Sequence, residues 1–498
     1  MGILGRMHSP AMGEVAARCS TLVAHIDAAW LCLPLQGDGD ADRLTELLGS
    51  PPDLVRRRLS GREVLYLGTV VDHAQVDAAL IRPLALGGGE PSSPLSFDAG
   101  QSPLRTYGDA VDALLAAHAV VLAGGAGTAV AVPAPHFPER EISEPSSEFI
   151  ARGPHAGFVE NLDTNIALIR HGLPRPELRW EKIGAGERSG THGALLYVAG
   201  MVRPELLDRI RRHLHRAHPS FTTDAAMLSQ WLAPRSALVF PTIGTTERPD
   251  RVVAALVEGR VAILVNGSPT VLLIPNVFAH LLHTPSDYYE SSLAALVNRL
   301  VRLLGLGVAV GSSALLVAVA TINQNLIPER LFIAISQARR GVPVPIAVEV
   351  LGLEATIEVI REAGVRLPAP VGESVSIIGA VIVGQAAVLA GLISAPAVVI
   401  VSLSFIASFV LPSPDLVMAL RFLRYPLIVL AAVFGLYGLT WGLLLILIYL
   451  CALDSFGVPY LAPLAPRRPP GLQDTLWRRW LPNLRPSFTA RENGGDSR

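Results

Sequence analysis

Four glutamates lie close together in the otherwise apolar last third of the chain. Within residues 345–365, Glu354, Glu358 and Glu362 recur every four residues and share one face of a helix, while Glu349 points elsewhere. Such a helix is too acidic to face lipid, so we expect an interfacial or re-entrant helix, or one that lines a water-filled space. Because repeated carboxylates concentrate cations, Glu349, Glu354 and Glu358 are candidates for a ring at the mouth of an oligomeric pore. The alternative is pairing with the nearby arginines Arg339, Arg340 and Arg361.

Polar side chains also interrupt the apolar runs that surround this helix. Gln385 lies in the middle of one run, and Ser402 and Ser404 lie in the next. A polar group within a membrane span is costly unless it faces protein or water. These positions, with Gly384, therefore either line a path for ions or serve simple helix–helix packing.

Other candidate sites have weaker support. His213, His215 and His218 lie in an arginine-rich amphipathic segment without acidic partners at metal spacing, which favours a solvated helix face. The glycine-rich stretch 184–193 lacks the Lys-Ser/Thr ending of a phosphate loop. No Ser-His-Asp or Cys-His grouping is evident. The sequence therefore predicts no catalytic site, no metal site and no cofactor.

Long apolar runs predict that the last third of the chain is a transmembrane domain, residues 291–453. A bilayer core of about 30 Å needs about 20 helical residues. We expect about four spans, at 303–322, 375–393, 396–411 and 425–450. Arg299 and Arg302 before the first span, and the arginine-rich tail 454–498, favour a cytoplasmic location for both ends.

The first 290 residues read as a soluble region built from a repeat. Residues 64–77 resemble 195–208, and residues 111–133 resemble 253–275, in the same order. Asn266-Gly267 is a strong signal for a hairpin turn. After an N-terminal tail, 1–19, we expect two duplicated α/β subdomains, at 20–135 and 160–290, joined by a polar surface linker, 136–159. The N-terminus lacks a secretory signal, which favours the cytoplasm. The net charge of −1 gives no reason to expect nucleic acid as a partner.

The chain resembles the A-subunit family of spore germination receptors (GerA type). The resemblance covers about 62–466 and rests on separate motifs in order: Arg140–Pro145, Thr164–Arg170, Thr246-Glu247-Arg248-Pro249-Asp250-Arg251, Glu258–Val265, Asp287-Tyr288-Tyr289, Gly341–Pro343, Glu362–Pro368, Gly384–Val388 and Ser455–Pro463. The chain departs from the family pattern at Asn266, where Asp is usual, and at Glu373, where Gln is common. Glu373 places an extra acid beside the second span, and a pore role for it would be particular to this protein.

The resemblance implies a protein of the inner spore membrane that acts with a polytopic B subunit, which recognises small nutrients, and a lipoprotein C subunit. It also implies a homo-oligomer that conducts cations when a germinant binds. A related branch, the stage V sporulation AF-type proteins, shares the fold and releases ions with a different partner. Two alternatives remain at this stage, a secondary transporter of small nutrients and a membrane-anchored enzyme, although neither an inverted repeat nor a catalytic grouping supports them.

Overall fold

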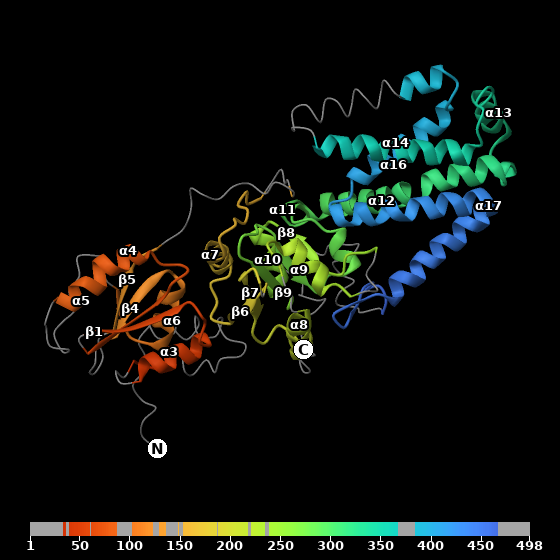
Figure 1. Ribbon diagram of the computed structural model, residues 1–498. Coiled ribbons are helices and arrows are strands. Elements are labelled where there is room, and N and C mark those ends of the chain that lie inside the picture. The colour runs from red at the N-terminus through yellow and green to blue at the C-terminus, as the bar shows by residue number, and fades with distance from the viewer. Residues whose placement is uncertain are drawn as a thin grey trace. The chain divides into compact units, whose positions relative to one another are not determined.

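The protein divides into two compact units in this computed structural model (Figure 1). The described residues of the N-terminal unit fall within 33–233 and 243–275, and those of the helical unit within 234–242 and 276–466. The structure describes residues 33–35, 39–59, 61–86, 102–122, 129–135, 148, 153–186, 188–217, 221–234, 239–366 and 384–466.

The N-terminal unit begins with a five-stranded antiparallel sheet that is covered on both faces. Its strand order is β1-β2-β4-β5-β3. Val64 and Tyr66 pack on one face of β2 and Leu65 on the other, which is the period of two that a sheet buried on both sides requires. Helices α3 and α6 cover the face of Leu65. The elements in order are α3 Asp40–Leu48, β1 Leu54–Leu59, β2 Arg62–Leu67, α4 His73–Val76, η1 Asp77–Ile81, α5 Arg82–Leu86, β3 Ser102–Leu104, α6 Tyr107–Leu115, β4 His118–Leu122 and β5 Ala129–Pro133.

A second five-stranded antiparallel sheet follows with the same strand order, β6-β7-β9-β10-β8. The predicted repeat therefore appears as a repeated topology, with β2 corresponding to β7 and the pair β4-β5 to β9-β10. Helices α7 and α10 cover one face of this sheet. The elements are α7 Leu162–Gly172, β6 Leu178–Gly184, β7 His192–Val198, α8 Pro204–Ala217, α9 Ala225–Leu232, β8 Gly244–Thr246, α10 Pro249–Val257, β9 Val261–Val265 and β10 Val271–Ile274.

Local signals explain two features of this second half. The amide of Ser268 donates to the carbonyl of Val265, which closes the expected turn, and only Gly267 needs a positive φ (88°). The linker before α7 does not stay on the surface throughout. Phe158 is buried in the core beneath α7 and α10, because an aromatic ring gains more from burial than the polar residues before it.

The helical unit contains two long apolar helices among the residues described, α12 and α17. At 1.5 Å per residue, the 30 residues of α12 extend about 45 Å, longer than a bilayer core. The elements are η2 Phe278–Leu281, α11 Ser286–Tyr289, α12 Ser292–Thr321, η3 Gln324–Leu326, α13 Glu329–Ala338, α14 Ile346–Arg366, α16 Ala395–Phe409, α17 Pro414–Ala452, β11 Asp454–Ser455 and β12 Val458–Pro459.

Helix α17 is bent inside the run 425–450, which we expected to form one span. Gly435 has φ 62° and ψ −142°, and this non-helical residue divides α17 into two arms. A Cβ placed on Gly442 would lie 2.5 Å from Leu427 Cδ2, although these residues would be about 22 Å apart in a continuous helix. The second arm therefore folds back on the first, and the sharp bend is visible in Figure 1.

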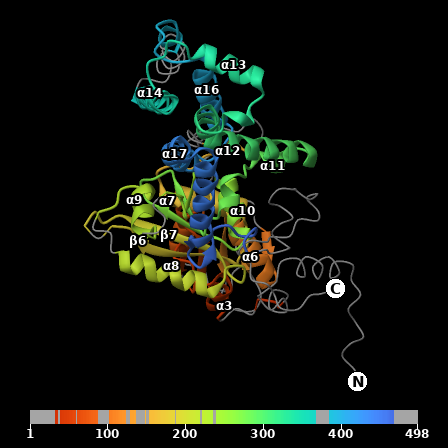
Figure 2. The same ribbon diagram turned by 90° about the vertical axis from the view of Figure 1, so that its right-hand side faces the viewer.

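The other expected spans differ in how far the structure supports them. The run 303–322 falls within α12 apart from its last residue, and 396–411 corresponds to the shorter helix α16. Residues 384–389 of the run 375–393 are helical, and 375–383 lie outside the described residues. Helix α13 lies at one end of the bundle, where it contacts α16 (Figures 1 and 2), and none of its residues is buried.

Helix α14, for which we expected an interfacial or re-entrant position, packs lengthwise against α12, α16 and α17. Its start lies beside the start of α16, since Glu349 bonds Ser394, and Arg361 lies over Phe405 further along both helices. Helix α16 in turn runs antiparallel to α12, because Ser404 contacts Ala309 whereas the later Ala407 contacts Gly305. Helix α14 therefore runs antiparallel to α12 at the same depth, and its acidic side chains find partners on its neighbours.

Candidate functional site

Two carboxylates of α14 are enclosed by the helical bundle. Glu349, 4% exposed, accepts hydrogen bonds of 2.5 Å from both the amide and the hydroxyl of Ser394, at the start of α16. Arg339, which follows α13, places its Nε 3.5 Å from the other carboxylate oxygen. One of the pairings expected from the sequence is therefore present, and it ties α14 to α16 and to the end of α13.

Glu354 lies at the centre of the bundle and is 6% exposed. Its carboxylate accepts a 2.7 Å hydrogen bond from Ser313 Oγ of α12 and lies 3.3 Å from Arg424 Nη1 of α17. Arg424 also donates to the carbonyl of Ser404, whose hydroxyl donates to the carbonyl of Ala309 at 3.0 Å. Because Ser313 is at the middle of the apolar run 303–322, this cluster lies at mid-depth of the predicted first span. It connects all four helices of the bundle.

Glu358 forms the outermost of the three pairs. Its carboxylate accepts a 2.6 Å bond from Arg421 Nη1 of α17, and its side chain remains 40% exposed. Arg361, one of the three arginines expected as partners of these glutamates, instead lies 4.9 Å from the centre of the Phe405 ring, in cation–π geometry. Glu362, further along the same face, is exposed. The acidic face thus passes from buried to exposed along α14.

The remaining predicted polar positions are not gathered into this cluster. Gln385 is exposed and Ser402 is half-buried, whereas Ser404 is buried beside Arg424. Glu373 lies outside the described residues. The pore or gating role of Gln385, Ser402, Ser404 and Glu373 stays a prediction.

Sequence reasoning missed the partners Arg424, Arg421, Ser313 and Ser394. Two signals were available. The arginines stand immediately before an apolar run, and Ser313 interrupts another run at its centre, where polar residues are unfavourable without a partner. The pairing itself spans 63 residues for Arg421 and 70 for Arg424, and no spacing rule covers such distances.

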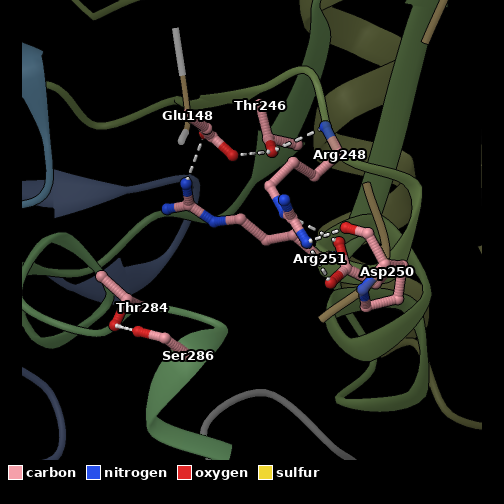
Figure 3. Close-up of polar contacts among 8 residues, drawn as sticks. Glu148, Thr246, Arg248, Asp250, Arg251, Thr284 and Ser286 are labelled. Atoms are coloured by element: carbon pink, nitrogen blue, oxygen red, sulfur yellow. Dashed lines mark hydrogen bonds and ion pairs between the residues drawn. The ribbon is translucent and has the colours of Figure 1, made fainter. Parts of the chain in front are cut away.

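The motif Thr246–Arg251 holds the chain that precedes α7, as Figure 3 shows. Arg248 is 1% exposed and donates two hydrogen bonds, of 3.1 and 2.8 Å, to the carboxylate of Asp250. It donates a third, of 2.9 Å, to the carbonyl of Pro154. Glu148 receives bonds from Thr246 at 2.9 Å and from Arg251 at 2.8 Å. The N-cap of α10 is Arg248, and Pro249 occupies the first helical position, which proline favours.

The neighbouring motif residue, Glu247, takes part through its backbone, because its carbonyl accepts from the amide of Phe158 at 2.8 Å. The motif therefore fastens the linker to the second sheet. Its charges act as structural ties, and the geometry offers no catalytic arrangement.

The second motif, Asp287-Tyr288-Tyr289, anchors the base of α12. Asp287 is fully buried and accepts a 2.7 Å bond from Arg302 and one of 3.4 Å from Arg299. Burial alone would raise the pKa of Asp287, but the hydrogen bond from Arg302 and the charges of both arginines lower it below the ordinary value. Arg299 also lies over the ring of Tyr288, and Tyr289 is exposed. Both arginines that precede the predicted first span are therefore engaged in buried pairs with Asp287.

No group of three or more His, Cys, Asp or Glu side chains suited to a metal ion occurs in the part of the chain that the structure describes. What the bundle does offer is a set of carboxylate–arginine pairs among the helices of the predicted transmembrane domain. Such groups are rare within membranes and mark ion pathways, proton relays or sensors.

Comparisons with known proteins agree on one family. Residues 42–488 match the family described as Bacillus/Clostridium GerA spore germination protein. The chain is 35% identical over 466 residues to spore germination protein KA of Bacillus subtilis (strain 168), covering 90% of this chain and 85% of that protein. It is 36% identical to spore germination protein A1 of the same organism, covering 72% and 73%.

An uncharacterized membrane protein of Bacillus subtilis (strain 168), YfkQ, is 38% identical, with 71% of this chain and 70% of that protein covered. Among solved structures, the N-terminal domain of the A subunit of the Bacillus megaterium spore germinant receptor GerK3 aligns with 22% identity and a TM-score of 0.35, covering 48% of this chain and 94% of that one.

Proposed function

The chain belongs to the GerA spore germination protein family, the A subunits of germinant receptors, and we propose that it oligomerises into a germinant-gated cation pathway. It is a membrane protein and a receptor subunit rather than an enzyme. In this proposal the pathway crosses the spore inner membrane, with the N-terminal unit and the C-terminal tail in the cytoplasm. A polytopic B-type subunit binds the nutrient, and a lipoprotein C-type subunit completes the receptor.

The observation that carries the proposal is the outer face of α14. On the face that α14 turns away from its own bundle, the small residues Gly352, Ala355 and Thr356 lie between two exposed valines, Val348 and Val359. The outer faces of the neighbouring helices carry large apolar side chains, such as Leu403, Ile406 and Phe409 on α16. Large apolar side chains suit lipid, whereas small residues suit close helix contact or a narrow passage. We therefore assign the outer face of α14 to the path at the centre of an oligomer.

The inner face of α14 supplies the gate in this proposal. At the depth of Glu354, three arginines (Arg361, Arg421 and Arg424) accompany two glutamates (Glu354 and Glu358), so the local charge disfavours cations. Rotation or shift of α14 relative to α17 separates these partners. Conduction then becomes possible when the glutamates, released from arginine, turn toward the path.

Cysteine accessibility tests the lining directly. Ala355→Cys and Thr356→Cys are introduced into the full chain with the exposed Cys451 replaced by Ser. Spores are treated with a charged, membrane-impermeant thiol reagent while a nutrient mixture triggers potassium release. The proposal predicts that the reagent blocks release in both variants. The matched control is Leu403→Cys on the outer face of α16, which the reagent should leave unaffected. Equal insensitivity of all three variants, with normal protein levels, would remove α14 from the path.

A further inference from the structure

The short hairpin after α17 packs against two other segments of the helical unit, residues 240–242 and residues 276–278. Its strands, Asp454–Ser455 and Val458–Pro459, are joined by Phe456 and Gly457, both with positive φ (52° and 91°). The Tyr460 amide bonds back to the carbonyl of Leu453 at 3.1 Å. This hairpin, residues 454–460, thus has a fixed shape and continues directly from the second arm of α17.

One hydroxyl in the hairpin joins both segments. Ser455 Oγ, fully buried, donates to the carbonyl of Thr242 at 2.7 Å and accepts from the amide of Asn276 at 3.1 Å. The Asn276 amide also lies 3.2 Å from the carbonyl of Thr242. Buried backbone groups that lose such a partner are costly, so the serine hydroxyl fixes the two segments against each other.

Tyr460, at the end of the hairpin, also contacts both segments. Its hydroxyl donates to the carbonyl of Pro241 at 3.0 Å, and its carbonyl accepts from the amide of Phe278 at 2.9 Å. Its ring packs with Phe240 and Phe278, at 6.2 and 6.4 Å between ring centres, and Phe240 also reaches Tyr449 of α17 at 6.2 Å. Polar and aromatic contacts therefore hold the same segments.

Each of these two segments is joined along the chain to a strand of the second sheet. Residues 240–242 lead directly into β8, and residues 276–278 follow β10 after Pro275. Strands β8 and β10 are hydrogen-bonded neighbours, with Leu273 opposite Gly244 and Val271 opposite Thr246. Both chain connections that leave this strand pair therefore run into segments that the hairpin contacts.

We propose that the hairpin 454–460 is a transmission joint that couples the β8-β10 strand pair to the second arm of α17. Ser455 and Tyr460 are positioning residues in this joint, since they set the end of α17 relative to the two chain connections. The inference rests on the proposed gated pathway, whose gate lies on α14 and the first arm of α17. Coupling between sites requires an element with two arrangements that both sites bias, and the folded-back α17 supplies that element.

The test compares triggered with untriggered potassium release from spores that carry full-length variants. Ser455→Ala removes the bridging hydroxyl, and Tyr460→Phe removes only the bond to Pro241. The matched control is Ser408→Ala, which removes a buried hydroxyl that bonds only within its own helix, to the carbonyl of Phe405. We expect both joint variants to accumulate and oligomerise normally but to lower release triggered by a mixture of amino acids, sugars and nucleosides about tenfold.

A second background separates coupling from conduction. The double variant Glu354→Gln/Arg424→Gln should leak potassium without nutrient, and adding Ser455→Ala should leave that leak unchanged, because the gate lies beyond the joint. Normal triggered release in both joint variants would overturn the joint alone. So would failure of both to accumulate, since the residues would then be purely structural. Absence of triggered potassium release in unmodified spores would instead overturn the pathway on which the inference rests.

Discussion

At the scale of single residues, the protein keeps several charges in places where they are stable only with a partner. Glu354 and Arg424 are both almost fully buried, and each has further hydrogen bonds, to Ser313 and to the Ser404 carbonyl. Removing one member of such a pair leaves an uncompensated charge, whereas replacing both is far less harmful. This difference makes the pair a sensitive point in the bundle and a suitable point for a gate.

Glu354→Lys places a second cation beside Arg424 and is expected to destabilise the bundle by about 3–5 kcal/mol. The variant should fail to accumulate in the spore membrane, as measured by immunoblotting. Glu358→Lys, at the half-exposed outer pair, serves as the control and should cost less, because solvent screens that pair. If Glu354→Lys assembles and still releases potassium normally, neither the gate nor a ring that includes Glu354 is tenable.

The Asp287 cluster gives a pH dependence with a definite sign. Burial alone would raise the pKa of Asp287, but the hydrogen bond from Arg302 and the charges of Arg302 and Arg299 hold it below its ordinary value of 3.8. A lowered pKa contributes stability that is fully present above pH 3.8 and is lost as the pH falls through the folded-state value. The urea midpoint of the detergent-solubilised chain should therefore exceed that of Asp287→Asn at pH 7, and the difference should shrink below pH 3.8. A difference that stays constant down to pH 3 would contradict this account.

At the scale of elements, the bent helix α17 shows where sequence patterns stop being informative. The hydropathy of the sequence predicts the apolar run 425–450 but not the reversal of chain direction at Gly435. The residues around Gly435 would suit a straight helix as well as a bent one. The reversal depends on contacts distant in sequence. The side-chain oxygen of Asn323, which follows α12, accepts a 2.7 Å hydrogen bond from the amide of Leu436 and so stabilises the bend. By contrast, the repeat of the two sheets was visible, since strand, turn and helix patterns recur locally.

Gly435→Ala should destabilise the folded-back arrangement by about 1–3 kcal/mol, because few residues other than glycine adopt this backbone conformation. The added Cβ would also overlap Asn323 Oδ1 and lie 2.9 Å from Ile322 Cβ. Gly307→Ala is the control, since an added Cβ there meets nothing within 4 Å. Thermal unfolding in detergent should show a lowered midpoint for Gly435→Ala only. Equal midpoints for the two variants would contradict the bend.

At the scale of the whole molecule, family membership and the division into a sheet-containing part and a helical part followed from the sequence, whereas the site did not. The motifs are local runs of residues, so their recognition needed no contacts. The site depends on which arginine reaches which glutamate across the bundle. Of the expected pairs only Glu349–Arg339 is present, and Glu354 and Glu358 instead meet Arg424 and Arg421. Arg361, another of the nearby arginines expected as a partner, lies over the ring of Phe405.

The central claim is that an oligomer of this chain conducts cations through a gate at the Glu354–Arg424 pair. Recording purified receptor in planar bilayers with unequal potassium chloride on the two sides tests it most directly. The account predicts discrete single-channel steps, a reversal potential on the cation-selective side, and a higher open probability in Glu354→Gln/Arg424→Gln than in the unmodified protein. Smooth, saturable potassium transport without steps in either protein would identify a carrier and contradict the claim.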